Sequence, residues 1–224
     1  MSIKLVVFDM AGTTVKDKNY VAVAFQAAMK QQGYDVPVKD INPLMGYEKP
    51  VAIKMMLEQH EPEQAKITDD LIKLIHRHFV SEMISFYQKS DDIQALPNAE
   101  DVFFKLRNKG IKVGLDTGFS RDIAEVIVER LNWKDKIDIM VASDEVEHGR
   151  PYPLMIQKMM KDLSIINSDS VVKVGDTEVD INEGKNAGCK YVIGITTGAF
   201  TKSELEPYEP THIIDDLVEV LEII

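Results

Sequence analysis

Residues 3–14 read Ile-Lys-Leu-Val-Val-Phe-Asp-Met-Ala-Gly-Thr-Thr. An apolar run leads to Asp9, and Gly12 with two threonines follows it, which predicts a buried strand that ends in a tight turn. A carboxylate at the end of a buried strand is costly unless a cation or a chemical role compensates it. Because ligands of open α/β sheets bind at the carboxyl ends of the strands, we predict that Asp9 is a nucleophile. A helix-capping role is the alternative for this residue.

Similar apolar runs recur along the chain between stretches of helical periodicity. The expected strands are residues 5–8, 111–115, 139–142, 171–174 and 191–195, and helices are expected at 99–108, 120–131 and 153–163. This alternation predicts an α/β fold, a doubly wound parallel Rossmann-like core sheet with helices on both faces. From residue 17 to residue 89 the pattern becomes amphipathic helical, with helices expected at 20–32, 50–58 and 69–87. We therefore predict a core from residues 1–16 and 90–224 and an inserted α-helical cap domain from residues 17–89.

The composition argues against several classes of partner. The net charge of −11 does not provide the basic surface that nucleic-acid binding requires. No apolar stretch approaches the roughly 18–20 residues that span a bilayer, so we expect no membrane partner. Cys189 is the single cysteine, and the chain begins with a strand pattern rather than a signal peptide. Both features predict a reducing, cytoplasmic environment.

Polar residues also follow the other expected strands. Thr117 and Gly118 could hold phosphate oxygens through a hydroxyl and backbone N–H groups at a helix start. Arg150 lies in a Gly-Arg-Pro-Tyr-Pro run, which would hold its guanidinium rigidly for a phosphoryl group. Asp176 and Asp180 lie four residues apart after a buried strand, a spacing that suits a hard divalent cation.

These four segments, in this order, strongly resemble the haloacid dehalogenase superfamily of aspartyl-nucleophile phosphotransferases. Most of its members carry a second aspartate, a general acid and base, at the position of Ala11, and a lysine at the position of Arg150. With alanine and arginine at these two positions, the chain resembles one branch of the superfamily, the phosphonoacetaldehyde hydrolases (phosphonatases) and the phosphonatase-like hydrolases. The resemblance implies a hydrolase that cleaves the carbon–phosphorus bond of phosphonoacetaldehyde to acetaldehyde and phosphate. Without an acid at residue 11, the leaving group should need no proton on oxygen.

In that branch a cap lysine within a Met-Gly-x-x-Lys stretch forms an imine, a Schiff base, with the substrate aldehyde. Residues 45–49, Met-Gly-Tyr-Glu-Lys, match this stretch. The resemblance implies that the imine at Lys49 accepts the electrons of the carbon–phosphorus bond while Asp9 attacks phosphorus. It implies that the substrate is bound by Met45, Gly46, Thr117, Gly118 and Arg150.

The resemblance also implies one bound Mg²⁺, which would offset the repulsion between the phosphonate and the nucleophile. Its ligands would be the Asp9 carboxylate, the Ala11 carbonyl and Asp176, with Asp180 supporting them. Related enzymes often pair through their caps, so the resemblance admits a homodimer.

Several positions depart from the branch and keep other readings open. Ala52 stands where the branch carries a histidine, Met10 replaces a tryptophan, and Phe119 stands where tyrosine is common. One alternative is a phosphatase that acts on a small phosphate ester or acyl phosphate without an imine. Another is a phosphate-binding protein without turnover. Lys49 precedes a proline at an expected helix start, so a solvent-facing lysine is the alternative there, with Lys54 as a second candidate for the imine.

Overall fold

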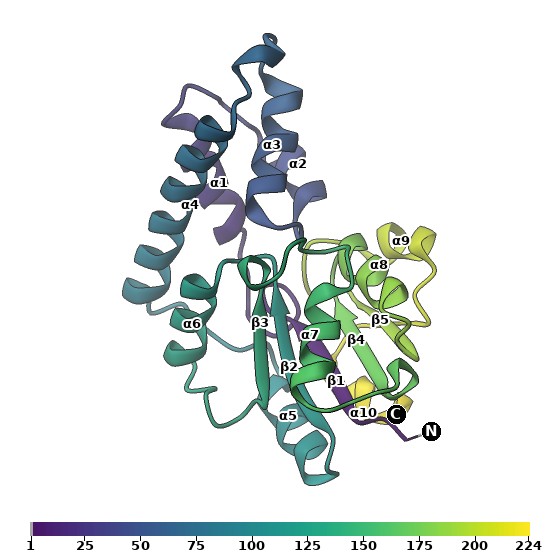
Figure 1. Ribbon diagram of the computed structural model, residues 1–224. Coiled ribbons are helices and arrows are strands. Elements are labelled where there is room, and N and C mark those ends of the chain that lie inside the picture. Colours follow the sequence, from purple (N-terminus) through teal and green to yellow (C-terminus); the bar gives the residue numbers. More distant parts are fainter. Residues whose placement is uncertain (1) are drawn as a thin grey trace.

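The structure, a computed structural model, describes residues 2–224. These residues form a six-stranded parallel sheet in the order β3-β2-β1-β4-β5-β6 (Figure 1). The strands are β1 Leu5–Asp9, β2 Lys112–Thr117, β3 Ile139–Ala142, β4 Val171–Gly175, β5 Tyr191–Ile195 and β6 His212–Ile214. The helices are α1 Tyr20–Lys30, α2 Val38–Ile41, α3 Lys49–His60, α4 Asp69–Lys89, α5 Ala99–Asn108, α6 Arg121–Arg130, α7 Leu154–Asp162, α8 Glu178–Asn186, α9 Lys202–Leu205 and α10 Val220–Ile223.

The central strand β1 is buried on both faces, as its unbroken apolar run predicts. Val6 and Phe8 belong to an apolar cluster that includes residues of α5, whereas Leu5 and Val7 belong to a second cluster with residues of α7. Helices therefore cover both faces of the sheet. The predicted doubly wound α/β core is confirmed.

The strand order brings the polar residues at the strand ends together. β1 lies between β2 and β4, and Asp9 is in register with Asp116 of β2. Asp176 directly follows β4. Such a point, where the connections diverge to opposite sides of the sheet, is the usual ligand crevice of an open α/β fold.

Helices α1 to α4 lie together beyond the carboxyl edge of the sheet (Figure 1). Phe25 of α1 stacks on Phe79 of α4 with the ring centroids 4.3 Å apart. Phe79 is in turn 6.4 Å from the ring of Phe119, which follows β2, so this helical group packs on the core near the strand ends. The exact division of the chain into core and cap at residues 17 and 89 stays a prediction.

One strand was not expected from the sequence. β6 pairs in parallel with β5 through Ile213 and its two neighbours, and a strand of three residues is too short for a periodic pattern to indicate it. Across residues 2–224, none of the helices combines the length and apolar character needed to cross a membrane.

Candidate active site

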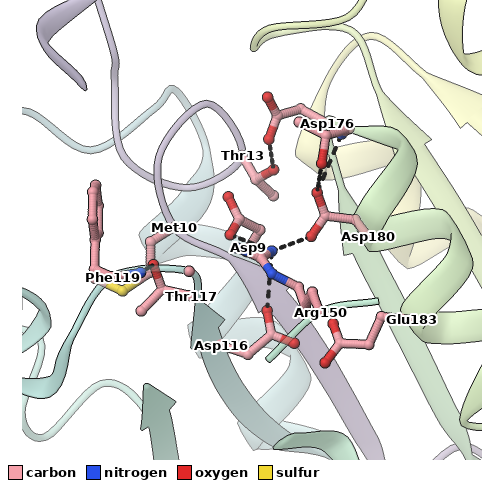
Figure 2. Close-up of polar contacts among 12 residues, drawn as sticks. Asp9, Met10, Thr13, Asp116, Thr117, Phe119, Arg150, Asp176, Asp180 and Glu183 are labelled. Carbon is pink, nitrogen blue, oxygen red and sulfur yellow. Dashed lines mark hydrogen bonds and ion pairs between the residues drawn. The ribbon is translucent and has the colours of Figure 1, made fainter. Parts of the chain in front are cut away.

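Asp9 and Arg150 meet at the carboxyl end of β1 (Figure 2). Arg150 Nη1 donates to Asp9 Oδ1 at 2.7 Å, and both side chains are almost fully buried. Burial raises the pKa of Asp9 to about 6, although the charge of Arg150 opposes the rise. The chain thus holds a desolvated carboxylate beside one rigid guanidinium, an arrangement suited to attack on an anionic phosphorus group.

The turn after Asp9 is tight and depends on a glycine. The carbonyl of Met10 accepts hydrogen bonds from the N–H groups of Thr14 and Val15, at 2.9 Å and 2.7 Å. Gly12 has φ +94°, and a Cβ there would lie 2.6 Å from Asp176 Oδ2. The turn can therefore approach Asp176 closely only with glycine at this position.

Asp176 is held from two sides. Thr13 Oγ1 donates to Asp176 Oδ1 at 2.9 Å, and the N–H of Ala199 donates to Oδ2 at 2.7 Å. Burial, together with the charges of Asp9 and Asp180, nevertheless raises the pKa of Asp176 well above its usual value. Two buried carboxylates that repel each other form a hard oxygen donor set whose charge a divalent cation would balance.

Asp9, Asp116 and Asp180 form a buried acidic triad that could bind a metal, because one oxygen of each lies within 4.8 Å of the others. Arg150 Nη1 already lies among these oxygens, in contact with Asp9 and Asp180 and 3.8 Å from Asp116 Oδ1. The guanidinium therefore supplies the positive charge within the triad.

A second buried cation lies behind the triad. Lys173 Nζ contacts Asp116 and lies 3.1 Å from both Asp180 Oδ1 and Glu183 Oε2, and all four side chains are fully buried. Burial alone would lower the pKa of Lys173, but the surrounding carboxylates raise it. This network orients Asp180, which in turn contacts Arg150 (Figure 2). Sequence reasoning missed it, although a lysine within the apolar strand 171–174 was a signal for it.

Lys49 is buried rather than directed to solvent, with 4% of its surface exposed. Its Nζ lies 5.0 Å from the ring centroid of Phe119 and 5.6 Å from that of Phe25, and it donates to the carbonyl of Tyr47 at 3.3 Å. Burial, and after it the charge of Arg150, lowers the pKa of Lys49 to about 8. By contrast, Lys54 is exposed and pairs with Glu58 of its own helix.

Nine of the ten residues proposed for the site line one cavity of about 110 Å³. They are Asp9, Ala11, Met45, Gly46, Lys49, Thr117, Gly118, Arg150 and Asp176. The tenth, Asp180, lies behind Arg150 in contact with its guanidinium. Thr117 Oγ1 accepts from the N–H of Phe119 at 3.1 Å, which leaves the hydroxyl hydrogen available to an acceptor in the cavity. The cavity is small and mixed in polarity, so it suits a small anionic ligand.

The loop that carries Lys49 is fastened to the sheet side of the cavity. Glu48 Oε2 accepts from the N–H of Gly149 at 2.9 Å, next to Arg150. Tyr47 donates its hydroxyl hydrogen to Glu178 Oε1 at 2.9 Å, at the start of α8. These contacts hold the segment before Lys49 against the core, and Lys49 and Asp9 line the same cavity; neither contact was expected from the sequence.

Comparisons with known proteins show the family of the chain. A family model described as "Haloacid dehalogenase-like hydrolase" matches residues 6–194. The phosphonoacetaldehyde hydrolase of Bacillus cereus (strain G9842) is 28% identical over 224 residues, covering 95% of this chain and 84% of that protein. A bifunctional phosphonoacetaldehyde hydrolase/aminoethylphosphonate transaminase of Clostridioides difficile (strain 630) is 33% identical over 83% of this chain and 30% of its own length.

Solved structures share the fold. A phosphonoacetaldehyde hydrolase-like protein from Oleispira antarctica aligns with a TM-score of 0.87 at 22% identity, over 100% of this chain and 91% of that one. A structure titled as a predicted phosphoglycolate phosphatase from Haemophilus somnus 129PT aligns with a TM-score of 0.83 at 19% identity, over 100% and 98% of the two chains.

Proposed function

Because the chain belongs to the haloacid dehalogenase-like hydrolase family, we propose that it cleaves the carbon–phosphorus bond of phosphonoacetaldehyde through an aspartyl nucleophile and a lysine imine. One observation carries this proposal: Lys49, buried and with its pKa lowered to about 8, lines the same small cavity as Asp9. A surface lysine would be almost fully protonated at pH 7, whereas about a tenth of Lys49 is neutral and nucleophilic.

In the proposed reaction Lys49 acts on the aldehyde and Asp9 acts on phosphorus. The neutral amine of Lys49 adds to the aldehyde, and loss of water leaves a protonated imine. An Asp9 oxygen then attacks phosphorus, and the electrons of the carbon–phosphorus bond pass into the imine to form an enamine. Protonation at carbon and hydrolysis release acetaldehyde and free the lysine, and water cleaves the aspartyl phosphate. The leaving group is an enamine carbon, so no acid is needed at the position of Ala11.

The remaining cavity residues suit the phosphonate. The hydroxyl of Thr117 and the N–H of Gly118 can donate to its oxygens, while Arg150 supplies positive charge. In this structure the guanidinium of Arg150 contacts Asp9 directly. A phosphonate in the cavity would therefore share this guanidinium with the nucleophile.

The residues present also fit a magnesium ion. Asp9, the Ala11 carbonyl and Asp176 would hold it, since all three residues line the cavity and buried Asp176 forms no ion pair with a cationic side chain of residues 2–224. The ion would supply charge neutralisation between the phosphonate and the nucleophile. Asp180 would support this site indirectly, because its own oxygens contact Arg150, Lys173 and Thr177.

A phosphatase acting on a small phosphate ester or acyl phosphate is the second candidate. One observation favours it: the phosphate side of the cavity, formed by Asp9, Thr117 and Arg150, makes no direct contact with Lys49 among the contacts of residues 2–224. Phosphoryl transfer to Asp9 is therefore conceivable without the lysine. A leaving group that needs no protonation, such as that of an acyl phosphate, would suit alanine at residue 11.

The two candidates are separated by Lys49→Arg, which keeps a positive charge but cannot form an imine. We would measure release of acetaldehyde and phosphate from phosphonoacetaldehyde with Mg²⁺ for the wild type, Lys49→Arg and the control Lys54→Arg. We expect turnover by the wild type and the control and a loss of at least about 10³-fold in Lys49→Arg. No turnover by any of them, together with hydrolysis of acetyl phosphate that survives Lys49→Arg, would replace the proposal by the phosphatase.

A further inference from the structure

Imine formation at Lys49 needs a second group, because the carbinolamine formed from amine and aldehyde loses its oxygen only as water. A proton donor must therefore reach the aldehyde end of the substrate. Among the described residues that line the cavity, three carry carboxyl groups: Asp9, Asp17 and Asp176. This inference rests on the imine of the proposed function.

Two of the three carboxyl groups are already committed. Asp9 accepts from Arg150 and is the nucleophile of the proposed reaction. Both oxygens of Asp176 accept hydrogen bonds, one from Thr13 and one from the N–H of Ala199. Both groups also lie on the sheet side of the cavity, where the phosphonate would bind. Asp9 also raises the pKa of Lys49, but its proposed attack on phosphorus leaves it unable to serve the aldehyde carbon as well.

Asp17 lies in the segment between β1 and α1 and lines the same cavity as Lys49. It is half-buried, and its Oδ1 accepts from the N–H of Tyr20 at 2.7 Å. Its charge acts on residues of two different helices of the cap. It opposes the lowering of the pKa of Lys49 on α3 and, after burial, it does most to raise the pKa of Tyr87 on α4. These effects agree with the place of Asp17 in the lining of the cavity that also holds Lys49.

The direction in which the pKa of Asp17 is shifted suits a group that donates a proton. Burial raises its pKa, against the N–H groups of Tyr20 and Val21 and the charge of Lys49, all of which lower it. The protonated form is thus more populated than for an exposed aspartate. A helix-capping role at the start of α1 does not require an aspartate to line the cavity, as Asp17 does.

We propose that Asp17 is the general acid and base of imine chemistry at Lys49. In the forward direction, the Asp17 carboxyl proton moves to the carbinolamine oxygen, the carbon–oxygen bond breaks, and water leaves while the nitrogen lone pair forms the C=N bond. After carbon–phosphorus cleavage, the Asp17 carboxylate takes a proton from the water that adds to the product imine. This second transfer restores the acid, so no external reactant is consumed beyond the water of hydrolysis.

The test is borohydride trapping with phosphonoacetaldehyde and Mg²⁺, measured as the rate at which Lys49 becomes reductively modified, by peptide mass spectrometry. Asp17→Asn is the informative variant, because its amide oxygen still accepts from the N–H of Tyr20 while the transferable proton is lost. Asp35→Asn, at an exposed aspartate of the same helical region, is the matched control. Thermal unfolding and hydrolysis of acetyl phosphate report whether the fold and the Asp9 side stay intact.

We expect Asp17→Asn to slow trapping of Lys49 by about 10²-fold or more, with Asp35→Asn equal to the wild type. Asp17→Glu should recover part of the trapping rate, and hydrolysis of acetyl phosphate should be the same in Asp35→Asn and the wild type. Trapping at the wild-type rate in Asp17→Asn would overturn the role of Asp17 and leave the imine standing. Absence of any Lys49 adduct in the wild type would overturn both.

Discussion

The buried ammonium of Lys49 should make the protein less stable at neutral pH than a variant with an apolar side chain of similar size. Its pKa falls from 10.5 to about 8 because burial disfavours the charged form. At pH 7 the lysine is charged in both the folded and the unfolded chain, so the full shift counts against folding. At about 1.4 kcal/mol per pKa unit, the penalty is about 3 kcal/mol. We therefore expect Lys49→Met to raise the free energy of unfolding at pH 7 by about 3 kcal/mol.

The sign of the pH dependence follows from proton binding. Between pH 8 and pH 10.5 the unfolded chain holds the Lys49 proton more often than the folded chain does, so wild-type stability rises with pH in this window relative to the variant. The advantage of Lys49→Met should then shrink to about 1 kcal/mol at pH 10. Titrating groups that Lys49 does not affect cancel in the difference, whereas Asp17 and His76, whose pKa values the Lys49 charge lowers, change in the variant.

Urea unfolding of the wild type and Lys49→Met at pH 7 and pH 10 measures these differences directly. Lys54→Met, at an exposed position of the same helix, is the control and should change stability by less than about 0.5 kcal/mol at either pH. A Lys49→Met variant that is less stable than the wild type at pH 7, or a difference that does not fall with pH, would refute the assignment of a desolvated amine. The nucleophilic role of Lys49 would then lose its physical basis.

Three further perturbations test the geometry. Gly46→Ala should raise KM for phosphonoacetaldehyde at least about 10-fold in steady-state assays. The backbone φ of Gly46 is +87°, and a Cβ there would lie 2.4 Å from Thr177 Oγ1. Unchanged kinetics would contradict this packing. Glu48→Ala should raise KM about 10-fold with less effect on kcat, since it removes the acceptor for the N–H of Gly149, whereas Glu48→Gln should stay within about 3-fold of the wild type. Removal of divalent cations with EDTA should abolish phosphate release and lower the unfolding temperature, and Mg²⁺ should restore both; full activity in EDTA would exclude the proposed donor set.

The fold followed from local patterns because the central strands β1 and β4 are buried along their whole length. Runs such as Leu5–Phe8 can be satisfied only between two layers of helices, so their alternation with amphipathic stretches leaves few other architectures. β6 has only three residues and carries no such pattern, and its position depends on pairing with β5. The short helices α2, α9 and α10 are equally local features that tertiary contacts decide.

The positions of candidate site residues at strand ends could be predicted from the sequence. Contacts between segments that lie far apart in the sequence could not. Asp9 and Thr117 end their strands and Asp176 follows one; the carboxyl ends of these neighbouring strands must meet, and the three residues line one cavity. The contact between Glu48 and Gly149 joins positions about a hundred residues apart, and no periodicity connects them. Whether Lys49 is buried was also undecided in the sequence, because a lysine before a proline at a helix start is usual at a surface.

The chemistry proposed here depends on separating two kinds of positive charge across one small cavity. Arg150 is held by several carboxylates, which keep the pKa of the guanidinium high and the charge fixed near Asp9. Lys49 contacts two aromatic rings and a carbonyl instead, and the charge of Arg150 contributes to lowering its pKa. The permanent positive charge of Arg150 therefore favours the neutral form of the Lys49 amine. An electrophile with an anionic end and an aldehyde end would match both sides, with its phosphonate at Arg150 and its carbonyl carbon at Lys49. A simple phosphate ester would leave Lys49 buried, partly charged and without a role, at the stability cost that Lys49→Met measures.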